Sequence, residues 1–196
     1  MQIVFNLPQL TSPDSSPAEV KQLRAILKVC IDGIRQAYVQ SRIPASDVTL
    51  TDGRGGEVLL NLPHSFEIDE ALNSRILRRM LDGLIACNCV YLKFHPQTPT
   101  LYRSGVVYDR TKVWESIPAL YSVKPDGRKF GDCKSLTAAM VAILRMKGIA
   151  ANPTFRWNRR DDGGLDYHIL VQTNEGFHDP SKVLGMGADE NVWFRR

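Results

Sequence analysis

A cysteine at the start of a strongly patterned helix is the feature that most constrains this chain. After Cys133, apolar residues recur at intervals of three and four, as they do on one buried helix face. Asp132 is a typical N-cap, and Gly148 follows basic residues that suit a helix C-terminus. The spacing therefore predicts a helix that begins at Cys133, with the apolar stripe Leu136, Ala139, Met140, Ile143 and Leu144.

This position gives the Cys133 thiol two chemical advantages. The partial positive charge at a helix N-terminus lowers the pKa of a thiol and favours the nucleophilic thiolate. The unpaired N–H groups there, beginning with that of Cys133 itself, can stabilise an oxyanion. We therefore predict that Cys133 is a nucleophile.

A nucleophilic cysteine needs a base, and the base needs an orienting group. His168 lies in a strand-like segment, and Asp179 follows a turn signal at residues 174–176. If residues 174–175 form a two-residue turn, Asp179 is the diagonal neighbour of His168, at about 7–8 Å between backbones. A three-residue turn with a bulge would change this parity, and the sequence leaves both turns open. His178, on the opposite face of a regular strand, is the alternative base.

The remaining segments predict a mixed α+β fold in which the cysteine-bearing helix packs on an antiparallel sheet bearing His168 and Asp179. We expect one domain over residues 1–196, with an N-terminal α/β annex at 1–95 and the catalytic core at 96–196. Amphipathic patterns and turn signals predict helices at 17–42 and 69–87, and strands within 1–15, 47–62, 90–94, 101–108, 154–157 and 167–173.

Composition excludes several classes of protein. The chain has 196 residues, of which 43% are hydrophobic and 23% charged, as in ordinary globular domains. No apolar run reaches the roughly 18 residues of a membrane span, and the N-terminus lacks the pattern of a signal peptide. The net charge of +4 is scattered in short groups, which speaks against a nucleic-acid partner. Four cysteines are too few for a disulfide scaffold, so we expect a reducing compartment.

Three other patterns are best explained by structure. Cys87 and Cys89 with the distant His95 lack a fourth ligand and the usual spacing of a zinc site, so we expect core packing and no metal. The glycine-rich residues 53–56 are too short for a nucleotide-binding motif and are typical of a hairpin tip. Trp193 and Phe194 are expected to pack on the core.

The order of these motifs resembles the transglutaminase-like superfamily over roughly residues 110–185. The shared features are a cysteine at a helix start, a strand with histidine, and a hairpin leading to Asp179 and Pro180. This papain-like group includes proteases, amidases, peptide N-glycanases and transglutaminases. The resemblance implies that Cys133 is the nucleophile, His168 the general base and acid, and Asp179 the orienting residue, with no cofactor. Members often carry an aromatic residue next to the histidine, commonly a tryptophan after it, whereas here Tyr167 precedes the histidine and Ile169 follows it. Members also use a glutamine or tryptophan upstream of the cysteine as a second oxyanion donor, and Trp114 and Tyr121 are weak candidates for that role here.

The resemblance implies a thiol-dependent hydrolase or acyltransferase that acts on peptide or isopeptide bonds of a protein or peptide substrate. A compact core behind an N-terminal annex is also similar to proteins encoded by tailed bacteriophages. The alternative is therefore a non-catalytic virion or tail-assembly module with the same fold, whose partners are other virion proteins. Either interpretation predicts a cytoplasmic or virion-associated protein with no membrane partner.

Overall fold

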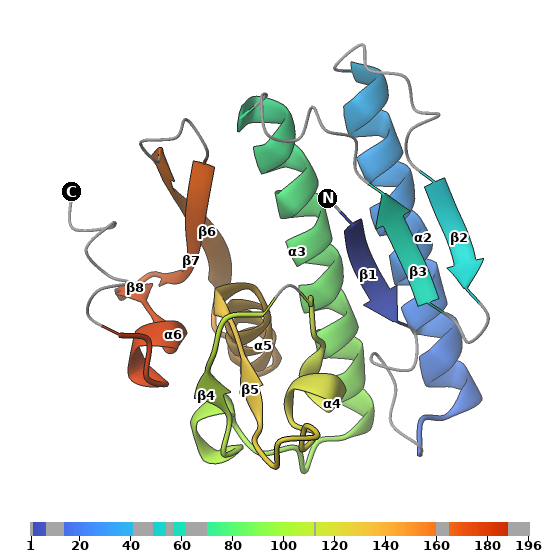
Figure 1. The fold of residues 1–196 in the computed structure, drawn as a ribbon. Helices are drawn as coiled ribbons and strands as arrows, with labels where there is room; N and C mark the ends of the chain where they lie inside the picture. Colours follow the sequence, from blue (N-terminus) through green and yellow to red (C-terminus); the bar gives the residue numbers. More distant parts are fainter. Residues whose placement is uncertain are drawn as a thin grey trace.

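The computed structural model describes residues 2–6, 14–40, 49–53, 57–61, 70–111, 113–159 and 165–187, which form a mixed α+β fold. Two long helices lie side by side, and a three-stranded antiparallel sheet lies beside them (Figure 1). The strand order in that sheet is β1-β3-β2, and its β2–β3 hairpin confirms the predicted pair of strands. These elements are β1 (Gln2–Asn6), α2 (Pro17–Gln40), β2 (Thr49–Gly53), β3 (Glu57–Asn61) and α3 (Glu70–Phe94).

The start of α2 follows the predicted capping pattern. The Ser16 hydroxyl oxygen accepts a hydrogen bond from the Glu19 N–H at 3.2 Å, and Pro17 occupies the first helical position. The apolar face of α2 packs on α3 through Leu23, Leu27 and other fully buried side chains. The first predicted helix is therefore confirmed.

Helix α3 is longer than predicted, and the expected strand at residues 90–94 is wrong. Val90 and Tyr91 favour strands in isolation, but burial continues at helical spacing from Leu84 to Leu92. The Asn88 side chain accepts a hydrogen bond from the Ile117 N–H at 2.8 Å. Packing on both sides of α3 outweighs the local strand preference.

The C-terminal half begins with short elements. The predicted strand at 101–108 is mostly wrong, because the Ser104 hydroxyl donates to the Leu101 carbonyl at 2.6 Å and accepts from the Val106 N–H at 3.2 Å, which closes a local turn. The elements are η3 (Leu101–Arg103), β4 (Val107–Tyr108), α4 (Ile117–Leu120), β5 (Phe130–Gly131), α5 (Cys133–Met146), β6 (Ala151–Arg159), β7 (Leu165–Thr173), β8 (Gly176–His178) and α6 (Pro180–Val183).

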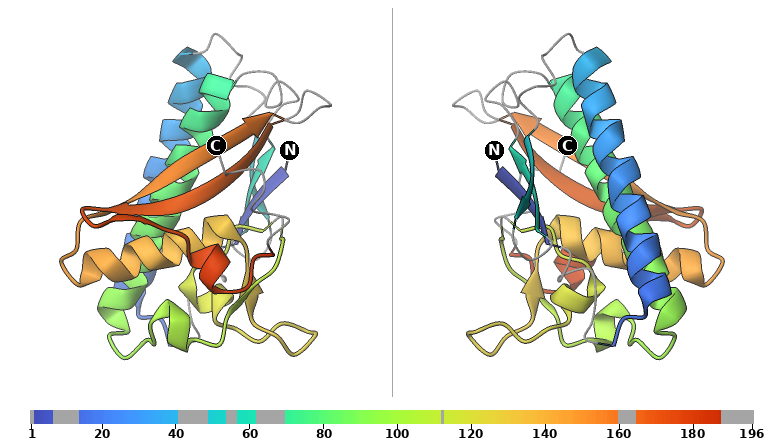
Figure 2. Two further views of the ribbon diagram at one scale, coloured as in Figure 1. Left: turned by 90° about the vertical axis from the view of Figure 1, so that its left-hand side faces the viewer. Right: turned by 90° about the vertical axis from the view of Figure 1, so that its right-hand side faces the viewer.

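One hydrophobic core joins the two halves. Helix α3 contacts α2 on one side and α5 on the other, and α5 contacts β6 and β7 of the antiparallel sheet β6-β7-β8. The β6–β7 hairpin crosses the long helices (Figure 2). Buried apolar side chains run without a break from Leu23 in α2 to Val171 in β7, so residues on both sides of position 95 share this core. In the described ranges, no helix has the length and apolar character needed to cross a membrane.

Candidate active site

The first turn of α5 has the geometry that the sequence predicts. Asp132 is the N-cap in an extended conformation, and its carboxylate accepts a hydrogen bond from the Lys134 N–H at 3.3 Å. Cys133 is the first helical residue, and only 9% of its surface is exposed. The N-cap and the helix start are therefore confirmed.

Helix α5 is held against the backbone of β7 next to His168. One turn after Cys133, the Thr137 hydroxyl donates to the Ile169 carbonyl at 2.9 Å. The backbone N–H of Ile169 interacts with the Cys133 sulfur, and so do the N–H groups of Cys133 and Lys134. The sulfur thus lies beside the strand residue that directly follows the histidine.

The β7–β8 hairpin brings Asp179 to His168. Thr173 pairs with Gly176, so the turn has two residues, and the simpler of the two predicted turns is confirmed. The His168 Nε2 atom lies 2.9 Å from Asp179 Oδ2. The other Asp179 oxygen accepts from the Lys182 N–H at 3.1 Å, because Asp179 is the N-cap of α6. The start of α6 therefore fixes the carboxylate that faces the imidazole.

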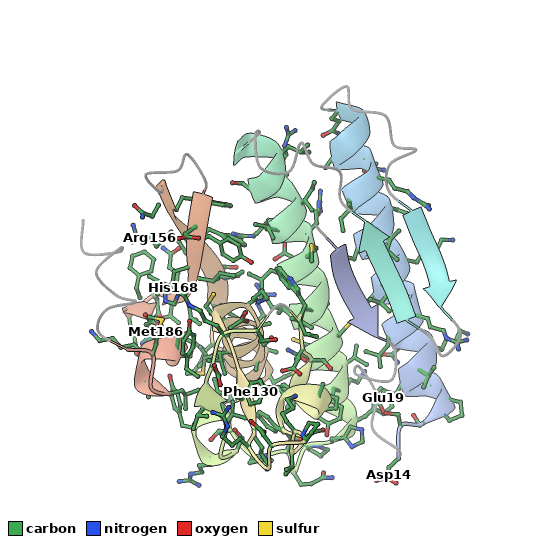
Figure 3. The ribbon with its side chains drawn as sticks, in the orientation of Figure 1. Asp14, Glu19, Phe130, Arg156, His168 and Met186 are labelled. Atoms are coloured by element: carbon green, nitrogen blue, oxygen red, sulfur yellow. The ribbon has the colours of Figure 1, made fainter. Side chains whose placement is uncertain are left out.

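Electrostatics favour a charged Asp179. Partial burial raises its pKa, but the hydrogen bond and the positive charge available on His168 lower it, as do the N–H groups of Lys182 and Ser181. The net result is a pKa below the usual value for aspartate. His168 itself is buried, with 3% of its surface exposed, and Figure 3 labels it among the C-terminal strands, to the left of α3.

The predicted lowering of the Cys133 pKa is wrong for the thiol in its resting surroundings. Burial raises its pKa to about 12, the N–H group of Ile169 opposes this shift, and the negative charge of Asp179 adds to it. Removal of water thus outweighs the helix N-terminus, because a buried isolated thiolate loses its solvation. A thiolate at this position requires a proton acceptor that becomes positively charged beside it.

A buried charged cluster underneath the helix start was not predicted. The Lys134 ammonium pairs with the Asp132 carboxylate and donates to the Thr111 carbonyl at 2.6 Å. Burial lowers its pKa to about 8, and the nearby Glu115 opposes this shift. Glu115 in turn pairs with Lys124 at 2.5 Å. A lysine in a first helical turn normally faces solvent, so no sequence signal distinguishes this one.

The weaker candidates lie elsewhere or have other partners. Trp114 is buried, with the Lys134 ammonium 6.0 Å from its ring centre. Burial raises the pKa of Tyr121 to about 12, and the groups that act on its phenol are Ser104 and Tyr91. The alternative base, His178, has its Nε2 atom 3.0 Å from the Thr173 hydroxyl.

The cysteines of α3 and His95, which directly follows this helix, are packing residues in this structure. His95 stacks on Tyr91 with ring centres 4.3 Å apart, and its Nε2 atom lies 3.2 Å from Glu19 Oε2. Cys87 is buried, and burial raises its pKa to about 12. The described part of the chain contains no group of three or more potential metal ligands from His, Cys, Asp and Glu.

Some predicted features lie outside the described residues. These are residues 54–56 of the predicted hairpin tip and the C-terminal Trp193 and Phe194. Comparison of the chain with protein-family models, curated proteins and solved structures gave no match.

Proposed function

We propose that this protein is a thiol-dependent hydrolase or acyltransferase of the transglutaminase-like kind, acting on amide bonds through Cys133, His168 and Asp179. The observation that carries the proposal is the 2.9 Å contact between His168 Nε2 and Asp179 Oδ2, together with a cysteine at a helix start whose sulfur interacts with the N–H of Ile169. An ordered nucleophile, base and orienting carboxylate is the pattern of cysteine acyl transfer.

The contact assigns a role to each ring nitrogen of His168. Asp179 engages Nε2, so Nδ1 is the nitrogen that would take the proton from the Cys133 thiol. The resulting thiolate attacks the carbonyl carbon of the substrate amide and forms a tetrahedral oxyanion. The imidazolium then gives its proton to the departing amine as the carbon–nitrogen bond breaks, which leaves a thioester on Cys133.

The second half of the reaction reverses these roles. Water, or a second amine, gives a proton to Nδ1 of His168 and attacks the thioester carbon. The carbon–sulfur bond breaks, and the Cys133 sulfur recovers its proton. The N–H of Cys133, at the open end of α5, is the donor nearest to each oxyanion.

The raised thiol pKa is compatible with this mechanism. A lone thiolate is disfavoured in a buried site, but transfer of the proton to His168 creates an ion pair instead of an isolated charge. Asp179, whose pKa is lowered, stabilises the imidazolium half of that pair. The nucleophile would therefore form as a pair with His168, not by independent titration of the thiol.

A second candidate is a non-catalytic assembly module with this fold, such as a virion or tail component. The near-complete burial of Cys133 and His168 favours it, because a substrate carbonyl must reach the sulfur. In that case the His168–Asp179 pair would only anchor α6 to the sheet.

Product analysis separates the two functions. Wild-type protein and Cys133→Ala are incubated with peptides, isopeptides and cell-wall peptide fragments, with and without an added primary amine, and the products are identified by mass spectrometry. The enzyme proposal predicts cleaved or amine-linked products from the wild type only. The matched control is Cys30→Ala, which removes another buried thiol and is expected to keep activity. Identical mixtures from wild type and Cys133→Ala would contradict the enzyme proposal.

A further inference from the structure

A groove of about 480 Å³ lies on the exposed side of α3, between α2 and β6. This volume is within the range of ordinary ligand sites. Helix α3 contributes three arginines to the groove, α2 contributes two glutamines, and β6 contributes an aromatic ring. These residues are Arg75, Arg78, Arg79, Gln36, Gln40 and Phe155.

The three arginines lie on one face of α3 because they are spaced three and four residues apart. Arg78 leans toward β6, where it donates to the Pro153 carbonyl at 2.9 Å, and it lies 3.6 Å from Asp82. The stem of Arg79 lies against Gly33 of α2. Among the described residues, no carboxylate lies within ion-pair distance of Arg79. The Arg79 guanidinium therefore suits an external anion.

The neutral groups of the groove indicate which kind of anion fits. The side-chain amides of Gln36 and Gln40 can both donate and accept hydrogen bonds, as a peptide backbone does. A phosphodiester backbone offers acceptors only, so it leaves the acceptor oxygens of these two amides without a donor. Guanidinium groups bind carboxylates in a bidentate manner, and Phe155 offers an apolar contact.

We propose that this groove is a binding site for an acidic segment of a polypeptide, in which glutamate or aspartate side chains bind the arginines. The site is separate from the Cys133 site. Phe155 is opposite Ile169 in the sheet, whereas His168 is opposite Arg156, so Phe155 and His168 project from opposite faces of the hairpin. Figure 3 shows Arg156 and His168 on the side away from α3. The groove therefore captures protein chains independently of any chemistry at Cys133.

Fluorescence anisotropy with a dye-labelled, glutamate-rich peptide containing one phenylalanine tests the proposal. The comparison peptide has glutamine at every glutamate position. The test variant is Arg75→Gln with Arg79→Gln, which leaves the structural contacts of Arg78 intact. The control variant, Lys21→Gln with Arg24→Gln, removes two exposed charges from α2 outside the groove. Thermal melting verifies that each variant is folded.

We expect the wild type and the control to bind the acidic peptide at least about tenfold more tightly than the test variant, since charge-assisted hydrogen bonds are lost. A second variant, Gly33→Gln, keeps every charge but places a side chain in the groove against the flexible Arg79 stem. It should also weaken binding.

Three outcomes would overturn the proposal. One is equal binding of the acidic and glutamine peptides, and another is equal binding by the test and control variants. The third is tighter binding of a single-stranded oligonucleotide of the same charge, which would assign the groove to nucleic acid. None of these results depends on catalytic activity.

Discussion

The α2–α3 interface and the α5–β7 junction contain the same chemical groups in different arrangements. Each has a buried cysteine and a histidine bonded to a carboxylate: Cys30 with His95 and Glu19, and Cys133 with His168 and Asp179. Burial raises the pKa of both thiols to about 12. Residue types and burial alone therefore do not distinguish a catalytic site from a packing site.

The direction of the hydrogen bonds distinguishes the two regions. The Cys30 thiol donates to the Arg79 carbonyl at 3.3 Å from within a helix, so its proton is engaged. The Cys133 sulfur is instead surrounded by backbone N–H groups, which stabilise negative charge on it. His95 ties the end of α3 to the start of α2 through Glu19, whereas His168 lies next to the residue that contacts the sulfur. Of these two regions, the α5–β7 junction is the one whose backbone N–H groups favour negative charge on the sulfur.

The largest expected effect separates the two histidines. His168→Ala should reduce amide turnover by about a thousandfold or more, because the base is lost. His95→Ala should leave turnover within about twofold and lower only the melting temperature. The two variants are compared by measuring their steady-state rates and their melting temperatures. A similar loss of turnover in both would erase the distinction between the regions.

The next effect concerns stability in the α2–α3 region. Leu84 is fully buried in α3, so Leu84→Ala should cost about 2–5 kcal/mol of unfolding free energy through the cavity it leaves. Urea denaturation measures this cost. The exposed Val29 on α2 is the matched control, and Val29→Ala should cost less than about 0.5 kcal/mol. Equal losses of unfolding free energy in the two variants would mean that the shared hydrophobic core is not the source of stability.

A smaller, pH-dependent effect is expected at Asp179. Its pKa lies below the usual value in the folded protein, so the charged carboxylate stabilises the fold above the ordinary aspartate pKa of about 4. That contribution is lost as the pH falls through the folded-state value. The difference in melting temperature between wild type and Asp179→Asn should thus be widest near neutral pH and should close in acid.

The exposed Asp126, whose pKa is also lowered by the hydrogen bonds of Arg128, is the control for this effect. The difference in melting temperature between wild type and Asp126→Asn should change with pH in the same direction. It should be smaller, since water screens a surface ion pair. A difference in melting temperature between wild type and Asp179→Asn that does not change with pH would contradict a charged Asp179 in the folded protein.

The smallest effect is expected at the start of α2. Ser16→Ala removes the hydroxyl that caps the Glu19 N–H and should cost about 1 kcal/mol of stability. Turnover should not change, because this cap belongs to the α2–α3 region and not to the proposed active site. Chemical denaturation and rate measurements on the same preparation test both statements. A clear fall in turnover would link α2 to the candidate active site.

The sequence predicts those features that depend on local chemistry. The caps at Ser16 and Asp132 follow from side chains that bond nearby N–H groups, and the two-residue turn makes Asp179 the diagonal neighbour of His168 by simple counting. The continuation of α3 through residues 90–94 depends on partners far away in the chain, which local propensity does not contain.

The pKa values of Cys133 and Lys134 likewise depend on parts of the chain that are distant in the sequence. The helix N-terminus suggests a lowered pKa for Cys133, but the opposite direction results from the sheet and the segments that bury the thiol. The burial of Lys134 between Asp132 and Thr111 likewise depends on a loop more than 20 positions away, since its carbonyl partner lies at a sequence separation of 23. Such environments are properties of the assembled fold.

The most direct test of a thiolate that forms only with His168 is competitive alkylation. Wild type and His168→Ala are treated with limiting iodoacetamide at mildly acidic pH, and labelling of each cysteine is followed by mass spectrometry. We predict that Cys133 is labelled well before Cys30, Cys87 and Cys89 in the wild type, and that His168→Ala slows only Cys133. Equal, slow labelling of all four thiols in both proteins would contradict the account.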